Sequence, residues 1–322
     1  EGYKYLRQNA FVPNPDPKSY EAGKGRRALG SYLKYNYVPL EDSVWQAFHK
    51  REQTSRTLEY AYDDFCLSTL AKVLGKTADY EVLRQRALNY KNVIDPATGW
   101  ARGRYADGRW SSNFDPFAAR ASFITEGSPA QYTWFVPHDM NGLMQQVGGK
   151  QHFIAKLDTM FEQGKYWHGN EPGNHTAYLY AFAGVPWKTQ RWVRQLIREE
   201  YTTDAGGLSG NEDGGQMSAW LVFSMMGFYP VCPGKPYYVI GSPIFKEMSV
   251  KVGNGKVFKI ETLNNLEKNC YIQSATLNGK SYNRAYLTHT QILEGGTLIL
   301  KMGSKPNKEW GGNATELSSI FQ

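Results

Sequence analysis

The amino-acid sequence predicts a mainly α-helical fold, an α/α toroid or helix bundle, followed by antiparallel β-structure. Three observations carry this prediction. Apolar residues recur near every 3.6 positions between Thr54 and Gly75. Further helical stretches follow, several of them paired through short loops as in helical hairpins. After Pro233-Gly234 the pattern changes to alternation around a Gly-Asn-Gly turn, which is typical of a β-hairpin.

The elements follow in order along the chain. The first 39 residues predict connecting structure with a short helix near Leu29–Tyr35. The helix from Thr54 ends at Gly75, and a second helix covers Asp79–Asn92. The stretch from Asp95 to Gln131 is rich in Gly, Trp, Arg and Phe, and structureless loops of this length are usually functional. Later helices are predicted at about Thr133–Val147, Gln151–Phe161, Thr176–Ala183, Thr189–Tyr201 and Gly215–Met225. We therefore divide the chain into a helical region, 1–235, and an antiparallel β region, 236–322.

The composition is that of a globular protein, with 41% hydrophobic and 21% charged residues. The net charge of +7 comes from Lys and Arg spread along the chain, so we predict no nucleic-acid partner. No stretch approaches the ~20 apolar residues of a membrane span, and the first residues lack a signal-peptide pattern. Cys66, Cys232 and Cys270 are far apart, which predicts buried thiols and neither a zinc site nor a disulfide framework.

Two acidic side chains, Asp63 and Asp64, interrupt the apolar helix that starts at Thr54. Adjacent helical residues point in different directions, so we expect at most one of them to face the core. An exposed acid beside a buried, paired one is the structural alternative to a functional role.

Glu126 precedes Gly127 and an aromatic-rich segment that we predict to be helical. A carboxyl in an apolar cleft has a raised pKa, which suits a general acid. The alternative is a carboxylate held at a helix N-terminus by the dipole. Nearby, His138-Asp139 resembles half of a metal-phosphohydrolase site, but its other ligands are missing, so we favour a structural hydrogen bond.

Two later loops carry oxygen ligands and acids beside glycines. In WHGNEPGNHTAYLY, Asn170 and Glu171 offer hard oxygen ligands, which suit calcium rather than zinc, although the spacing is not that of an EF-hand. In GNEDGGQMSAW, Asp213 precedes a predicted helix N-terminus, which would keep a general base ionised. Plain N-capping by Asp213 is the alternative. A protonated Glu, an ionised Asp and a hard-cation loop together fit the hydrolysis of a glycosidic bond.

Several long strings resemble glycoside hydrolase family 92, the calcium-dependent inverting exo-α-mannosidases found mainly in bacteria. They stand in family order from about Gly25 to Gly241 and are TLEYAYDDFC, TEGSPAQYTWFVPHD, HGNEP, GNEDGGQMSAWLVFSMMGFYPVCPG and YVIGSPIF. The resemblance implies an α/α six-hairpin toroid, incomplete in this chain, coupled to β-sandwich structure. It also implies a secreted, periplasmic or cell-surface location in a bacterium.

The resemblance assigns residues to roles in the cleavage of terminal α-mannose from glycans. Glu126 matches the general acid and Asp213 the general base. Asn170 and Glu171 fall in the stretch tied to the calcium ion, which would bind O2 and O3 of the sugar. The residues expected in the sugar pocket are Arg26, Asp63, Asp64, Gln131 and His138.

The chain departs from the family pattern in three respects. Ala130 stands where members often carry Trp, and Asn211 stands where a second acid is common. A family catalytic module has a β-sandwich and further helices before the point where this chain begins. We therefore expect roughly the C-terminal half of an enzyme, with the N-terminal half as a partner, and poor hydrolysis by this chain alone. Two alternatives stay open: a toroid glycosidase for another sugar, and a non-catalytic glycan-binding homologue.

Overall fold

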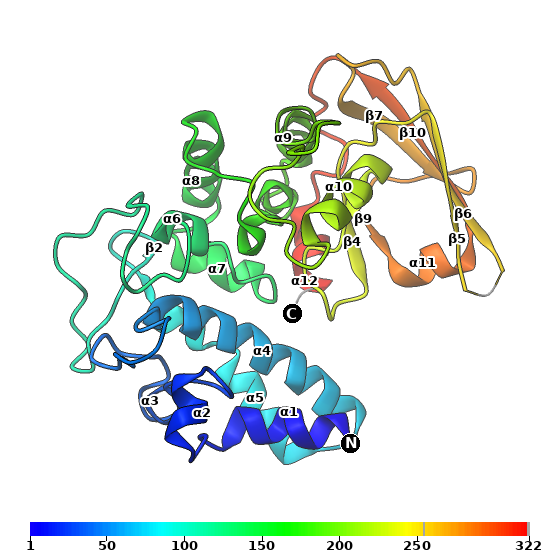
Figure 1. Cartoon of the computed structure of the whole chain (residues 1–322). Coiled ribbons are helices and arrows are strands. Elements are labelled where there is room, and N and C mark those ends of the chain that lie inside the picture. The colour runs from blue at the N-terminus through cyan, green and yellow to red at the C-terminus, as the bar shows by residue number, and fades with distance from the viewer. Residues whose placement is uncertain (254, 321–322) are drawn as a thin grey trace. The chain divides into compact units, whose positions relative to one another are not determined.

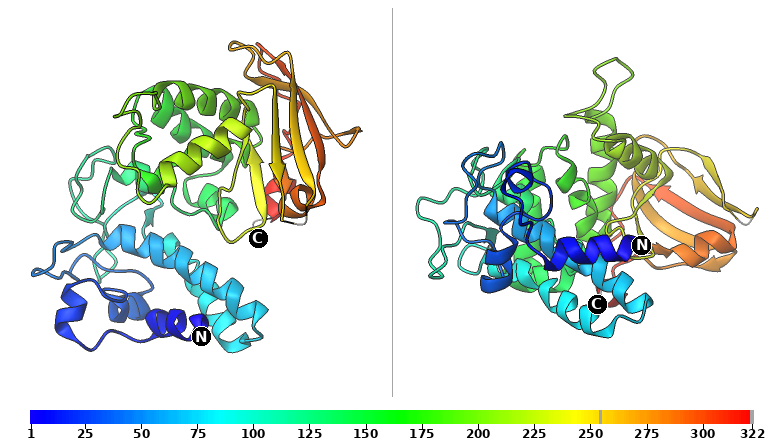
Figure 2. Two further views of the ribbon diagram at one scale, coloured as in Figure 1. Left: turned by 45° about the vertical axis from the view of Figure 1, so that its right-hand side comes forward. Right: turned by 60° about the horizontal axis from the view of Figure 1, so that its bottom comes forward.

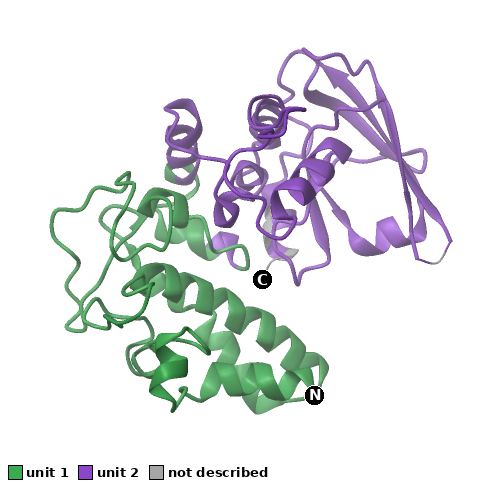
Figure 3. Cartoon of the chain, in the orientation of Figure 1, with its two compact units in different colours: residues 1–138, 142–152 green, residues 139–141, 153–322 purple. Residues whose placement is uncertain are grey.

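In the computed structural model the chain forms two compact units, and residues 1–253 and 255–320 are described. Unit 1 consists of residues 1–138 and 142–152, and unit 2 of residues 139–141 and 153–322 (Figure 3). Among the described residues, no helix combines the length and the apolar character needed to cross a membrane.

Unit 1 is mainly helical (Figure 1). Its elements are α1 Gly2–Phe11, α2 Pro17–Glu21, α3 Leu29–Tyr35, α4 Gln53–Val73, α5 Thr77–Arg86, the 3-10 helix η1 Asn89–Asn92, the short ribbon β1 Ile94–Asp95 and β2 Trp100–Ala101, and α6 Pro129–Tyr132. The helices α7 Met140–Gln146 and α8 Lys150–Glu162 contain residues of both units.

Helix α4 organises unit 1. Helices α1 and α5 lie along it (Figure 2) and share a small apolar core that is made of Ala10, Leu67, Ala71 and Leu83. A second cluster, formed by Ala28, Leu29, Tyr32 and Val38, packs against Tyr60 on another face of α4. The helix ends where the sequence predicted, because Gly75 adopts a left-handed φ of +68° that suits glycine.

Unit 2 combines helices with two sheets. Its helical elements are η2 Glu171–Gly173, η3 Thr176–Ala181, α9 Pro186–Glu199, α10 Gln216–Met226, α11 His289–Glu294 and α12 Ala314–Ile320. Its strands are β3 Phe228–Tyr229, β4 Tyr237–Ile240, β5 Glu247–Lys251, β6 Val257–Leu263, β7 Tyr271–Leu277, β8 Lys280–Ser281, β9 Tyr286–Thr288 and β10 Gly296–Gly303.

The larger sheet has the strand order β5-β6-β10-β7-β8, and the smaller one has the order β3-β4-β9. Strand β10 lies in the middle of the larger sheet, antiparallel to β7 and parallel to β6. Alternate residues of these strands face one core, which contains Phe258, Ile260, Ile272, Leu298 and Leu300. The alternation of apolar and polar residues in the sequence therefore matches the alternation of buried and more exposed side chains along the strands.

Most predicted helices are confirmed, with one clear error and two smaller ones. The helix predicted at Asp79–Asn92 ends at Arg86 and is followed by η1, and the one predicted at Thr176–Ala183 is the 3-10 helix η3. The helix at Leu29–Tyr35 has the predicted bounds, and α4, α8, α9 and α10 agree with the prediction within a few residues. The helix predicted at Thr133–Val147 is wrong in its first half, because residues 133–139 are not helical. Pro137 explains this result, since its ring disfavours the α conformation of Val136 and removes a backbone donor.

The prediction of a purely antiparallel region at 236–322 is also wrong in part. Strands β5 and β6 form the predicted antiparallel hairpin, although Asn254 of its turn lies outside the described residues. The pair of β6 and β10 is parallel, and α11 and α12 lie in the same region. Alternation along a strand reports which face is buried and carries no information on the direction of its neighbour. The toroid and the boundary at residue 235 stay predictions.

Candidate active site

The predicted acid lies on the loop that leads into α6. Glu126 is exposed, and Gly127 after it adopts a φ of +70°. The side chain of Ser128 caps α6 by accepting a hydrogen bond from the backbone N–H of Gln131 (3.2 Å), and Pro129 occupies the first helical position. The sequence thus turns from loop to helix two residues after the acid.

Hydrogen bonds on both sides of the acid join this segment to α4. Before the acid, the backbone N–H of Thr125 donates to Oγ of Ser55 at 2.7 Å. After it, the hydroxyl of Tyr132 donates to Oε1 of Glu59 at 2.9 Å. Since Ser55 and Glu59 are one turn apart on α4, the position of Glu126 depends on this helix from both sides.

The Glu59 carboxyl has an unusual environment. Burial raises its pKa to about 7, and the carboxylates of Asp63 and Glu126 also raise it, whereas the hydrogen bond from Tyr132 lowers it. Glu59 is not among the residues predicted from the sequence, because the acidic doublet Asp63-Asp64 dominates the pattern of this helix. The available signal was spacing, since Glu59 stands four residues before Asp63 on the same helix face.

As expected, only one of the two adjacent acids, Asp63 and Asp64, is buried. Asp64 is fully buried and accepts hydrogen bonds from Nη1 of Arg26 (2.6 Å) and from Nε and Nη2 of Arg86 (2.8 and 2.9 Å). The Tyr32 hydroxyl adds a longer contact of 3.2 Å. The Asp63 side chain is 55% exposed and lies 3.6 Å from Nη2 of Arg26. Unit 1 thus brings three predicted sugar-binding residues together, with only Asp63 open to solvent.

The other two predicted sugar-binding residues are buried. Gln131 is 8% exposed and contributes its backbone N–H to the cap of α6. His138 is 3% exposed, its Nε2 lies 2.8 Å from the carbonyl oxygen of Ala87, and its ring stacks against Tyr62 and Phe65. The favoured structural hydrogen bond of His138 is therefore present.

The predicted base lies on the loop before α10 in unit 2. Asp213 is exposed and adopts a left-handed φ of +49°, which Asp tolerates better than most residues do. The carboxylate that serves the helix start is that of Glu212, which accepts from the backbone N–H (3.0 Å) and hydroxyl (2.9 Å) of Ser218. Capping by the Asp213 side chain, the structural alternative, is thus not what the structure has: α10 begins with Gly215 as its N-cap and no side-chain cap.

The predicted calcium loop touches the loop of the base. A Cβ atom on Gly169 would lie 2.6 Å from the backbone nitrogen of Gly210, so neither loop has room for a side chain there. Asn170 follows directly and is 3% exposed, and Glu171 is half-buried at the start of η2. Unit 2 therefore brings the candidate calcium ligands and the candidate base loop into contact.

The donor atoms of the calcium loop fit a hard cation. Besides Asn170 and Glu171, this loop holds Oδ1 of Asn174 and Oγ1 of Thr176, which are buried and accept no hydrogen bond from the described residues. Buried polar atoms in this state normally have a partner such as water or an ion. The described residues contain no cluster of three or more His, Cys, Asp or Glu that could hold a metal. A cation here would take amide, hydroxyl and carboxylate oxygens, a set that suits calcium.

A buried histidine supports the two loops. His168 is fully buried, and its Nδ1 and Nε2 lie 2.8 Å and 2.9 Å from the hydroxyls of Tyr166 and Tyr201. The Tyr201 hydroxyl in turn donates to the carbonyl oxygen of Met217 in α10. Burial lowers the pKa of His168 to about 3, so its imidazole is neutral across the physiological range.

We expect this histidine to make the protein acid-sensitive. In the unfolded chain His168 takes up a proton near its ordinary pKa of about 6.5, whereas the folded chain resists this until about pH 3. The free energy of unfolding therefore falls as the pH falls through this window, and the contribution of His168 to this loss is about 2 kcal/mol at pH 5. In a His168→Gln variant, the unfolding free energy should fall less steeply over this window, as measured by urea unfolding at pH 7.5 and 5.0. His152→Gln, at an exposed position on α8, is the control, and equal pH slopes for all three proteins would contradict the expectation.

The site residues are distributed over both units. Glu126 lies in unit 1 with Arg26, Asp63, Asp64, Gln131 and His138, whereas Asn170, Glu171 and Asp213 lie in unit 2. Besides Glu59 and Tyr132, sequence reasoning missed the buried oxygens of Asn174 and Thr176. The signal for these two was their place in the same oxygen-rich string.

Comparisons with known proteins agree on one family. Residues 1–304 match the family model described as "Glycosyl hydrolase family 92 catalytic domain". An uncharacterized secreted glycosidase from Arthroderma benhamiae is 34% identical over 96% of this chain and 42% of its own length. Among solved structures, the family GH92 α-mannosidase BT3965 from Bacteroides thetaiotaomicron is 40% identical with a TM-score of 0.86, over 97% of this chain and 40% of its own. The family GH92 inverting mannosidase BT2199 from the same organism is 37% identical with a TM-score of 0.88, over 97% and 44%. The chain thus spans about two fifths of the length of these relatives.

Proposed function

Because the chain belongs to glycosyl hydrolase family 92, we propose that the protein it represents removes terminal α-mannose from glycans by hydrolysis with inversion. The observation that carries the proposal is the match to the family's catalytic domain over nearly the whole chain, with α-mannosidases among the similar structures. Since the chain spans only part of the length of those relatives, the proposal concerns the whole protein, and the full-length protein is the form to assay.

In this proposal the exposed carboxyls of Glu126 and Asp213 act on opposite faces of the sugar. Glu126 gives its proton to the glycosidic oxygen as the bond from that oxygen to C1 breaks. Asp213 takes a proton from a water molecule, whose oxygen forms the new bond to C1 and inverts its configuration. An inverting pair works with carboxyls ~6.5–9.5 Å apart, which leaves room for the water.

The remaining predicted residues hold the sugar and its surroundings. We assign sugar contacts to Asp63 and to Arg26, whose guanidinium Asp64 fixes in place by the 2.6 Å contact. Gln131 and His138 are assigned to the wall that supports the acid loop, in line with their burial. Arg26 would then be pre-positioned, which lowers the entropy cost of binding a hydroxyl group.

For calcium we propose Asn170 and Glu171 as ligands, with Asn174 and Thr176 as further oxygen donors. Bound there, calcium would place positive charge beside the sugar hydroxyls O2 and O3 and help to orient the ring. The protein supplies buried oxygen atoms for the ion, in a loop that packs closely against the backbone of Gly210.

Removing the metal should abolish activity. Chelation of the full-length protein should stop release of mannose, and calcium should restore it better than zinc, because the donors are oxygens. A readout independent of activity is the melting temperature, which calcium should raise by preferential binding to the folded protein. Glu171→Gln should reduce that rise, whereas Glu162→Gln on the surface of α8 should keep it. Recovery with zinc alone, or an equal rise in both variants, would show that the loop is not a calcium site.

The decisive test of function is release of free mannose from α-mannobiose. NMR of the first product formed would show inversion as β-mannose. A non-catalytic glycan-binding homologue would retain the disaccharide uncut, and a glycosidase for another sugar would release a different monosaccharide from a mixed panel. Either result would replace the proposed reaction.

We also propose that the protein acts outside the cytoplasm, as a secreted, periplasmic or cell-surface enzyme of a bacterium. The description of the relative from Arthroderma benhamiae as a secreted glycosidase supports the extracellular part of this proposal. For the chain described here, the proposed partner is the N-terminal half of the same enzyme. Mass spectrometry of purified active material would identify such a half.

A further inference from the structure

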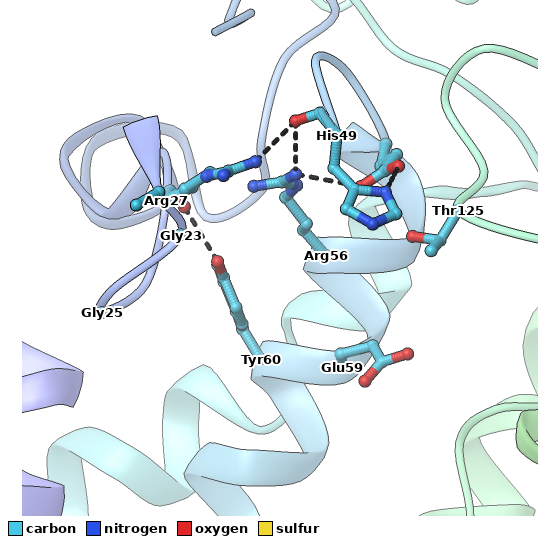
Figure 4. Close-up of a pocket in the computed structure, with 10 residues that line it drawn as sticks. Gly23, Gly25, Arg27, His49, Arg56, Glu59, Tyr60 and Thr125 are labelled. Atoms are coloured by element: carbon cyan, nitrogen blue, oxygen red, sulfur yellow. Dashed lines mark hydrogen bonds and ion pairs between the residues drawn. The ribbon is translucent and has the colours of Figure 1, made fainter. Parts of the chain in front are cut away.

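One face of α4 lines a cavity of about 450 Å³ that the proposed reaction does not use (Figure 4). The lining residues of α4 and its N-cap recur on one helix face: Glu52, Arg56, Glu59 and Tyr60. The other lining residues come from the segment before α3, from the loop before α4 and from the acid loop: Ala22, Gly23, Gly25, Arg27, His49 and Thr125. Small-molecule sites have volumes of ~300–1,000 Å³, so this cavity can hold a ring of the size of a sugar.

Two lining residues connect the cavity to the residues proposed for the reaction. Thr125 directly precedes Glu126, the proposed acid. Tyr60 packs against Arg26, a proposed sugar contact, whose guanidinium carbon lies 4.9 Å from the centre of the tyrosine ring. The cavity therefore adjoins both the acid loop and a residue assigned to the cleaved mannose.

The charged groups around the cavity favour a neutral ligand. Its two guanidinium groups are already engaged: Arg27 donates to the carbonyl oxygen of His49 at 2.6 Å, and Arg56 pairs with Glu52 at 3.0 Å (Figure 4). The carboxyls of Glu52 and Glu59 match the two guanidinium groups in number. Phosphate sites instead present arginine donors that are free to bind the anion, so a phosphorylated ligand fits this wall poorly.

Two neighbouring side chains of the wall offer a hydrogen-bond donor and an acceptor. Nε of Arg56 is buried and makes no hydrogen bond with the described residues, and buried donors in this state normally bind water or a ligand. The Glu59 carboxyl accepts one hydrogen bond, from the Tyr132 hydroxyl at Oε1, and a carboxyl has room for more. Because Arg56 and Glu59 are three residues apart on α4, they can serve adjacent hydroxyl groups of one sugar ring.

We propose that this cavity binds the leaving-group sugar of the glycan, a neutral pyranose, through Arg56 and Glu59. A general acid protonates the oxygen that departs with the leaving group, so this sugar lies on the side of the acid. The cavity is on that side, since Thr125 in its wall is the residue before Glu126. The inference rests on the proposed function and on Glu126 as its acid, and it adds the part of the glycan that remains after mannose is removed.

The test is to fill the cavity by Ala22→Trp in the full-length protein. Ala22 is exposed at the C-cap of α2 with a right-handed φ of −72°, so the indole can enter the cavity without backbone strain or loss of a polar partner. The measurement compares kcat/KM on α-mannobiose with kcat/KM on α-mannosyl fluoride, whose leaving group is a single atom. The ratio of the two should fall about tenfold, the worth of one or two hydrogen bonds to the lost sugar.

Two further variants and a binding measurement sharpen the test. Ala78→Trp places the same side chain at an exposed position of α5 and should leave the ratio unchanged. Arg56→Lys keeps the positive charge beside Glu52 but removes the Nε donor, so the ratio should fall about fivefold. In the Glu126→Gln background, calorimetry should show that α-mannobiose binds about tenfold more tightly than methyl α-mannoside, and Ala22→Trp should remove this difference.

The outcomes are distinguishable. A folded Ala22→Trp enzyme with an unchanged ratio overturns the inference, as does an equal fall with Ala78→Trp. Should Ala22→Trp not fold, Arg56→Lys decides, since an unchanged ratio there would refute the role of the cavity. A parent protein that hydrolyses neither substrate would instead refute the proposed function, on which the inference rests.

Discussion

Replacing Glu126 by Gln should lower turnover of an unactivated α-mannobiose by ~10²–10⁴ while the fold persists. Gln keeps the size of the side chain and cannot give a proton to the glycosidic oxygen. Glu126 is exposed on its loop, so little packing is lost. The measurement is initial-rate release of mannose by the full-length protein, with the melting temperature as the check on folding.

The same variant and Asp213→Asn should respond differently to an activated substrate. An aryl mannoside with a good leaving group needs little acid catalysis but still needs a base to activate water. It should therefore restore much of the turnover of Glu126→Gln and little of that of Asp213→Asn. Equal recovery by both variants, or near-normal turnover of Glu126→Gln on the disaccharide, would remove Glu126 from the acid role.

Replacing Asp64 by Asn should lower the free energy of unfolding by about 3–5 kcal/mol. The carboxylate is fully buried and is the shared partner of Arg26 and Arg86. An amide carries no charge and turns an N–H group toward guanidinium donors, which leaves buried positive charge uncompensated. Arg86 also donates to the carbonyl oxygen of Ala10 in α1, so the loss should spread from α4 to α1. Urea unfolding followed by circular dichroism measures the change.

Asp63→Asn is the matched control, since it makes the same chemical change one residue earlier. Its side chain is half-exposed and its contact with Arg26 is long, at 3.6 Å, so the cost should stay below about 1 kcal/mol. Similar losses of unfolding free energy in the two variants would contradict the expectation that burial makes Asp64 the more stabilising of the two acids.

The sequence predicts the helices well where propensity and packing agree. The apolar residues of α4 recur at the helical period and end at Gly75, and the structure has the same helix with nearly the same end. Between residues 133 and 139 the apolar content is equally high, but Pro137 breaks the helix. The direction of β10 depends on contacts between strands far apart in sequence, which a local pattern does not encode.

The candidate site could be predicted only in part for a similar reason. Loops beside glycine point to Glu126, Asp213 and the oxygen-rich string as candidates, because these features are local. The environment of Glu59 depends on Tyr132, 73 residues later, which folding brings within 2.9 Å. The sequence also does not show which acid binds the first turn of α10, since Glu212 and Asp213 stand in the same short loop. In the structure it is Glu212.

The place of β10 in its sheet has a consequence for the order of folding. The hairpin of β5 with β6 and that of β7 with β8 form from residues close in sequence, and each leaves one inner edge open. Strand β10, the latest of this sheet in the sequence, must insert between them. Long-range pairing of this kind is slow, and open strand edges promote aggregation in the meantime. The refolding rate of this sheet should therefore be set by the docking of β10, and the yield should fall with protein concentration.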